Sequence, residues 1–182
     1  MKIPTRIPTI AAALLLVTPL FLGGCATPTQ STAMVATPVG TVNRHPQSLS
    51  ITVAGGSETS AAGASKISDN DFADALRQSI TQSGLFAKVS PAGQSDYHLE
   101  VQIVRLDQPI MGFSMTVTLE ADWKLARQGD HQIVWQKAII STFTAKTGEA
   151  FAGVTRLRLA TEGAARANIQ DAIGQMSALA LP

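Results

Sequence analysis

The stretch FSMTVTLEADWKL, residues 113–125, alternates between apolar and polar side chains at every position. Successive side chains of a β-strand point to opposite faces of a sheet, so this period of two predicts a long strand with a packed face and a wet face. Burial on one face only is typical of antiparallel sheets. We therefore expect a fold built on a sheet that is covered on one side.

Further strands are predicted before and after this stretch. Residues 97–107 show the same alternation, and the turn sequence Gln128-Gly129-Asp130 leads into a third long strand at residues 131–145. The alternation of that strand is blurred at residues 137–140, where we expect a β-bulge. A shorter strand is predicted at residues 48–54, where apolar and polar side chains also alternate.

A helix with clear end signals is predicted at residues 68–82. Ser68 can cap its N terminus, and Gly84 provides the left-handed residue that commonly ends a helix. Its buried stripe recurs at four-residue spacing and consists of Phe72, Leu76 and Ile80.

The last predicted element is a helix at residues 154–179. Three charged residues at four-residue spacing are expected to line its solvent-exposed side, namely Arg158, Glu162 and Arg166. The order β-α-β-β-β-α predicts an α+β fold of two layers, with two helices packed on one face of a mostly antiparallel sheet of about four strands.

The N terminus has the pattern of a processed leader. Two basic residues, Lys2 and Arg6, precede an uncharged and largely apolar run at residues 10–22. That run is short for a membrane-spanning helix, which needs about 20 residues, but it suits the core of a signal peptide. The following Leu22-Gly23-Gly24-Cys25 resembles the processing box of bacterial lipoproteins. The resemblance implies a signal peptide at residues 1–24 and a mature chain that begins at a lipidated Cys25; the alternative is an ordinary secretory leader that is cleaved nearby.

The segment that follows the leader is predicted to be a flexible tether. Residues 25–47 are rich in Thr, Pro, Ser, Ala and Gln, a composition that buries too little apolar surface to order itself. A single α+β domain is then expected at residues 48–182. Cys25 is the only cysteine, so a disulfide bond within the chain is excluded.

The charge balance argues against nucleic acid as a partner. Removal of the leader takes Lys2 and Arg6 from the 14 basic residues and leaves all 13 acidic residues, so the mature chain has a net charge of −1. It also contains no run of basic residues. Nucleic-acid-binding domains are usually basic, with lysine and arginine clustered on one face.

Motifs for catalysis or metal binding are missing from the sequence. The three histidines, His45, His98 and His131, have no partner at metal-ligand spacing, and no nucleophile motif is present. Glu120 and Asp122 share one face of a predicted strand, where a solvated surface explains them better than a catalytic pair of carboxylates. We therefore expect no enzymatic activity, no cofactor and no metal.

Two connections carry apolar residues at places that normally face water. In residues 108–112, Ile110 and Met111 either fold back over the edge of the core or form an exposed contact for a partner protein or a bilayer. In residues 148–153, Phe151 stands between small residues, and we expect it to pack against the final helix. Ile110 and Met111 are therefore the candidate partner-contact residues.

The whole pattern resembles a known group of proteins. A lipoprotein box, a Thr/Pro tether, the segment FADALRQSITQSGLF at residues 72–86 and the sequence Asp96-Tyr97-His98-Leu99 resemble small uncharacterised proteobacterial outer-membrane lipoproteins. The element order is similar to that of lipopolysaccharide-assembly lipoproteins and of ABC-transport-auxiliary lipoproteins. This resemblance implies action through a protein partner, either a barrel or a transporter subunit. Since Ala26 follows the cysteine, it also implies attachment to the outer membrane, facing the periplasm.

Two functions of different class follow from these expectations. The first is a non-enzymatic accessory or scaffold lipoprotein in envelope assembly or lipid transport. The second is a module that binds a lipid or another amphiphile between the helix layer and the sheet, near Trp123 or Met176. Trp123 and Trp135 fall nearly opposite across their hairpin, and we expect them to form a cross-strand pair in the core.

Overall fold

The computed structural model describes residues 26–37, 39–61 and 63–182 of the chain. The predicted signal peptide at residues 1–24 and the predicted lipid attachment at Cys25 lie outside the described residues.

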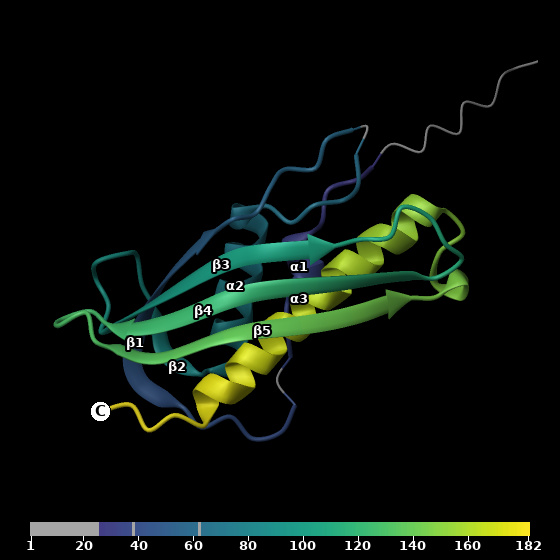
Figure 1. Ribbon diagram of the computed structural model, residues 1–182. Helices are drawn as coiled ribbons and strands as arrows, with labels where there is room; N and C mark the ends of the chain where they lie inside the picture. Colours follow the sequence, from purple (N-terminus) through teal and green to yellow (C-terminus); the bar gives the residue numbers. More distant parts are fainter. Residues whose placement is uncertain (1–25, 38, 62) are drawn as a thin grey trace, which may run out of the picture.

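In the described part of the chain, five strands form one sheet in the order β2-β1-β3-β4-β5 (Figure 1). Strand β1 is parallel to both of its neighbours, whereas β3, β4 and β5 pair in antiparallel fashion. The strands are β1 (His45–Ala54), β2 (Phe86–Val89), β3 (Tyr97–Asp107), β4 (Met115–Arg127) and β5 (Ile133–Ala145).

The helices cover one face of the sheet and leave the other face to solvent (Figure 1). They are α1 (Ser31–Met34), α2 (Asp69–Ser83) and α3 (Gly153–Ser177), and a short 3₁₀ helix η1 (Thr147–Glu149) precedes α3. The predicted class, α+β with helices on one face of an open sheet, is confirmed. The number of elements differs, because five strands and three α-helices are described where about four strands and two helices were expected.

The strand that the sequence did not reveal is β2. It has only four residues, of which Phe86 is buried while Ala87 and Lys88 are exposed, so it shows no usable periodicity. Because α2 carries the chain from β1 to β2, these two strands run parallel. Two of the four strand pairings are therefore parallel, and the sheet is more mixed than the predicted antiparallel one.

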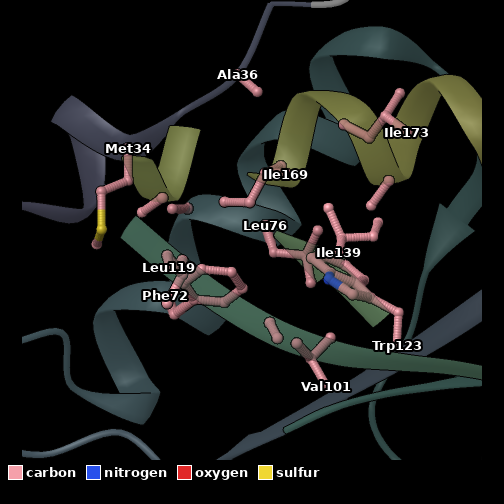
Figure 2. Packing of buried hydrophobic residues seen from close by; sticks show 14 of the residues in the cluster. Met34, Ala36, Phe72, Leu76, Val101, Leu119, Trp123, Ile139, Ile169 and Ile173 are labelled. Carbon is pink, nitrogen blue, oxygen red and sulfur yellow. The ribbon is translucent and has the colours of Figure 1, made fainter. Parts of the chain in front are cut away.

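The alternation that predicted β4 is confirmed from Met115 onward. Every second side chain of this strand, from Met115 to Leu125, is buried against the helices. Trp123 is fully buried beside Phe72 of α2, with their ring centroids 6.1 Å apart (Figure 2). Its indole N–H donates a hydrogen bond of 2.9 Å to Asn168 Oδ1 of α3, so the one polar group of this large side chain is satisfied. Strand β4 therefore joins both helices to the sheet.

The irregularities of β5 lie elsewhere than predicted. Residues 115–125 pair with β5 in continuous register, and the shift occurs near Val134 rather than at residues 137–140. The blurred alternation has another cause: Lys137 stands at a position of the packed side but is exposed, and Ile140 lies on the wet face with 61% of its surface exposed. The predicted aromatic pair is also displaced, since Trp123 pairs with Lys137, and Trp135 pairs with Leu125.

The segment predicted to be a tether packs on the domain instead. We call residues 26–36 the N-terminal strap. Its residues Met34 and Ala36 are wholly buried, and Met34 lies at the edge of the core cluster in Figure 2. Strand β1 also begins at His45, inside the predicted tether. Composition was misleading here because a few buried side chains and hydrogen bonds are enough to hold a short segment on an existing surface.

The strap covers the side of α3 that was expected to face solvent. Glu162 is only 2% exposed, and its Oε1 accepts hydrogen bonds from the Gln30 backbone N–H at 3.0 Å and from Arg158 at 3.2 Å. Arg166 donates from Nη1 to the Ala33 carbonyl at 2.7 Å. The charged ladder of α3 is thus a docking surface for the strap, not a solvated face.

Candidate contact surface at one end of the sheet

Two loops meet at one end of the sheet. Strands β4 and β5 start and finish there in register, with Met115 paired to Ala145. The β3–β4 connection, residues 108–114, leads into Met115, and the β5–α3 connection, residues 146–152, leaves from Ala145. The antiparallel pairing therefore places the two connections side by side (Figure 1).

These two loops expose four large apolar side chains. We call this group the apolar end; its members and their exposed fractions are Ile110 (98%), Met111 (82%), Phe113 (87%) and Phe151 (99%). Single exposed apolar residues are ordinary, but several of them on adjacent loops mark a contact surface.

The side chain of Arg156 forms hydrogen bonds with the backbone of both loops. It lies in the first turn of α3 and is buried. Its Nη1 donates to the carbonyl oxygens of Ala150 and Phe151, each at 2.7 Å, and its Nη2 donates to the Gly112 carbonyl at 3.5 Å. A guanidinium group presents its donors in a fixed planar fork, which suits the joining of carbonyls from two segments.

A second hydrogen bond joins the loops near the sheet. The Thr147 hydroxyl of η1 donates to the Phe113 carbonyl at 3.0 Å. At the start of η1, the Lys146 backbone N–H donates to Glu149 Oε2, and the Glu149 backbone N–H donates to the Lys146 carbonyl at 3.0 Å. The four apolar side chains of this end are therefore carried on loops whose backbones are fixed by hydrogen bonds.

The structure resolves the alternatives for the connection residues. Ile110 and Met111 do not fold back over the core; both point outward, and their contact with a partner stays a prediction. Phe113 was expected to be an inward residue of β4 but precedes the strand and is exposed. Phe151 was expected to pack against the final helix, and that expectation was wrong, because the small residues around it leave its ring uncovered.

The space between helices and sheet is filled by protein side chains. Trp123 and Met176, the residues near which an amphiphile was expected, are both fully buried in the core cluster. The carbonyl oxygen of Met176 lies 2.9 Å from Nε2 of His45, which is also buried. The packing around these residues therefore gives the amphiphile-binding function no support.

The polar residues considered for catalysis have structural roles. Glu120 pairs with Arg105 at 3.1 Å on the wet face, and Asp122 is exposed beside it. His98 Nδ1 lies 2.8 Å from the Ser50 hydroxyl, but Ser50 is wholly buried and the other ring nitrogen contacts Thr52 rather than a carboxylate. A hydrolytic triad needs an accessible nucleophile and an acid that orients the base.

No group of three or more His, Cys, Asp or Glu side chains among the described residues is arranged to hold a metal ion. Within the same residues, no helix combines the length and the apolar character needed to cross a membrane.

Comparison with known proteins identifies the fold. No protein-family model matches the sequence, and no curated protein matches it. Among solved structures, protein XCC0632 from Xanthomonas campestris, described with the family DUF330, is 17% identical, with a TM-score of 0.63 over 82% of this chain and 94% of that one. A minor lipoprotein from Acinetobacter baumannii is 12% identical, with a TM-score of 0.52 over 76% of this chain and 99% of that one.

A third similar structure is the hypothetical protein CT253 from Chlamydia trachomatis, which is 8% identical, with a TM-score of 0.52 over 74% of this chain and all of that chain. At such identities the likeness is one of fold. This chain thus shares its fold with bacterial proteins that include a lipoprotein, and the resemblance to lipopolysaccharide-assembly lipoproteins stays a prediction.

Proposed function

We propose that this chain is an outer-membrane lipoprotein, anchored by an acylated Cys25 and facing the periplasm, that acts as a non-enzymatic accessory or scaffold in envelope assembly or lipid transport. The observation that carries the proposal is the apolar end, with four exposed side chains on two loops that are fixed by hydrogen bonds. Loops that are already ordered lose little conformational entropy on binding. The apolar end is therefore suited to making contact without rearrangement.

Two further features support this role. The leader ends in the sequence that resembles a lipoprotein box, and acyl chains contribute about 0.8 kcal/mol for each buried CH₂ group, so two or three chains hold a protein firmly on a membrane. In the described sheet, β5 is an edge strand that pairs with β4 on one side only. Its free edge can accept a strand from an envelope partner such as a barrel or a transporter subunit.

The test is cross-linking of the intact lipoprotein in cells, followed by gentle-detergent purification and mass spectrometry of the retained proteins and lipids. We expect an N-terminal peptide that begins with acylated Cys25 and one envelope protein in stoichiometric amount. A chain without acyl groups, or one that retains no specific protein, would contradict the proposal.

A pair of variants shows whether the apolar end is needed. Ile110→Asp combined with Met111→Asp is expected to reduce the amount of complex and leave the fold intact. Both side chains are exposed, and the variant removes their contact either with the envelope protein or with the membrane on which the domain meets it. The matched control is Val39→Asp, since Val39 is equally exposed but lies beside the C-terminal part of α3. If the double variant unfolds, these two residues belong to the core and the contact role is wrong.

A further inference from the structure

We propose that the apolar end enters the headgroup region of the same membrane that carries the lipid anchor, so that the domain stands on the bilayer in one fixed orientation. The contacting side chains are Ile110, Met111, Phe113 and Phe151. The inference rests on the proposed function, because it uses the anchor at Cys25, and it names the bilayer as the partner of this surface.

The chain that follows the predicted anchor at Cys25 is bound to the domain without a flexible linker. Ala26, which is bonded directly to Cys25, donates its backbone N–H to the Ala61 carbonyl at 3.3 Å. One residue further on, the Thr27 carbonyl accepts a hydrogen bond of 2.7 Å from the Ser65 hydroxyl. The chain is therefore held on the domain from the first residue after the predicted lipid, and a membrane-bound Cys25 brings this part of the domain to the membrane surface.

Ser65 links the strap to the β3–β4 connection. Its carbonyl accepts a hydrogen bond of 2.6 Å from Gln108 Nε2, and the same amide donates to Thr161 of α3 at 2.9 Å. Ile110 follows Gln108 by two residues, as Cys25 precedes Thr27 by two. At about 3.5 Å per residue, each of these two-residue steps covers at most about 7 Å, so the chain enters the domain close to the apolar end.

The ribbon diagram shows that the start of the strap and the apolar end lie toward the same end of the molecule (Figure 1). The start of the strap and both loops of the apolar end lie in the half of the molecule away from the C terminus (Figure 1). The β4–β5 turn lies at the other end of the sheet, and β4 from Met115 to Arg127 spans about 40 Å. A domain that rests on the apolar end therefore holds this turn far above the membrane.

The side chains at the tips of the two loops are uncharged. The β3–β4 connection, residues 108–114, contains no charged residue, and the charged residues of the other connection, Lys146 and Glu149, lie at η1, before Phe151. The nearby Arg156 is turned inward onto backbone carbonyls. Uncharged apolar side chains suit the boundary between headgroups and acyl chains. The irregular loop backbone limits the depth of entry, because its polar groups need water or headgroups as partners.

The degree of exposure favours a bilayer over a protein as the occupant. Since each of the four side chains is at least 82% exposed, they scarcely touch one another and form no flat, packed patch. A protein partner would have to offer a separate pocket to each side chain. A fluid lipid phase accommodates separate side chains without complementary pockets.

The test measures membrane depth in the full-length lipoprotein. Because acylation consumes the thiol of Cys25, Met111→Cys introduces the one thiol that can be labelled with an environment-sensitive fluorophore. The labelled protein is placed in phosphatidylethanolamine–phosphatidylglycerol vesicles that contain nitroxide-bearing lipids. The matched control is Gly129→Cys in the β4–β5 turn, where a side chain meets open space.

We expect quenching at position 111 to exceed that at position 129 several-fold. Replacing Phe113 and Phe151 by Asp in the labelled Met111→Cys protein is expected to reduce the quenching, whereas Val39→Asp leaves it unchanged. Equally weak quenching at positions 111 and 129 would overturn the inference.

The outcomes separate this inference from the proposed function. If position 111 stays unquenched in vesicles but becomes shielded when the purified envelope complex is added, a protein is the occupant; the bilayer contact is then wrong and the accessory role stands. If position 111 is quenched but no envelope protein is retained in cross-linked cells, the bilayer contact stands and the accessory role falls. A chain that carries no acyl groups and stays off the vesicles contradicts both.

Discussion

Buried Arg156 donates a hydrogen bond of 2.7 Å to the backbone carbonyl of Phe151, whose side chain is almost completely exposed. The positive charge thus acts on the backbone alone and leaves the ring free. Because the same guanidinium also reaches Ala150 and Gly112, one side chain of α3 sets the spacing of two loops. The backbone that carries the apolar end is therefore held in place by hydrogen bonds from the folded domain.

The first prediction concerns this support. Arg156→Met removes the hydrogen bonds to three carbonyls and is expected to lower the free energy of unfolding by about 2 kcal/mol, since hydrogen bonds to charged groups contribute roughly 1.5–3 kcal/mol. Amide hydrogen exchange at residues 110–113 and 150–152 should also become faster. Urea unfolding and exchange measurements check the two effects.

The control for this prediction is Arg77→Met. Arg77 forms an exposed ion pair with Asp74 at 2.7 Å, and exposed pairs contribute about 0.5 kcal/mol or less. If both variants lose the same stability, or if loop exchange is unchanged in Arg156→Met, the support that we assign to Arg156 is absent.

The second prediction compares two glycines of α3. Gly174 is exposed, and a Cβ at this position would meet open space, so Gly174→Ala should raise the free energy of unfolding by about 0.5–1 kcal/mol through helix propensity. Gly163 faces the ring of Phe143, and a Cβ there would lie 2.3 Å from a ring carbon. Gly163→Ala should therefore destabilise the protein despite the same gain in propensity.

Thermal or urea unfolding of both glycine variants checks this pair. Overpacking typically costs about 1–3 kcal/mol, which outweighs the propensity gain. Stabilisation by both substitutions would show that α3 does not approach Phe143 as closely as described.

The strands and helices with many residues were predictable because their patterns repeat. The alternation of residues 115–125 survives in β4, and the Ser68 cap with the left-handed Gly84 marks the ends of α2 within one residue of the prediction. Short elements carry no such repetition. Strand β2 is fixed by its pairing with β1 after the α2 crossover, a long-range effect that no local pattern contains.

Two of the four side chains of the apolar end were predicted from the sequence as contact residues. Ile110 and Met111 stood out because large apolar residues interrupt a turn sequence. Phe113 was missed because it continues the alternation of β4 although it lies two residues before the strand begins. Phe151 was wrongly expected to be buried. The exposure of its ring depends on the hydrogen bond from Arg156 to its backbone carbonyl, and the sequence does not reveal that contact.

The third prediction concerns pH. The hydroxyl and the backbone N–H of Ser48 both donate to Asp96 Oδ2 at 2.7 Å, and these hydrogen bonds lower the pKa of Asp96 below its usual 3.8. A carboxyl group with a lowered folded-state pKa adds stability above its unfolded-state pKa. That contribution is lost as the pH falls through the folded-state value.

Asp96→Asn tests this assignment. The variant should be less stable than the unmodified protein at pH 7, and the difference should shrink as the pH is lowered below about 3.8. Urea unfolding from pH 7 to pH 2.5 measures it. A difference that does not change with pH over this range would show that the charge of Asp96 is not what Ser48 stabilises.

The last prediction tests whether the N-terminal strap fixes the anchor. Met34 is the largest fully buried side chain of the strap, so Met34→Ala removes its main apolar contact with the core, a change that costs about 2–5 kcal/mol at core positions. Because the strap lies at the edge of the core, we expect it to detach locally while the sheet and α3 remain folded. Proteolytic cleavage within residues 26–36 should then become at least ten-fold faster, whereas Thr32→Ala, at an exposed position, should leave the rate unchanged.

In the membrane-bound protein, the detached strap becomes a flexible linker, and the quenching of a label at position 111 should fall. If Met34→Ala leaves the strap protected, other contacts hold it, and if the strap detaches without any change in quenching, the apolar end binds the membrane independently of the anchor.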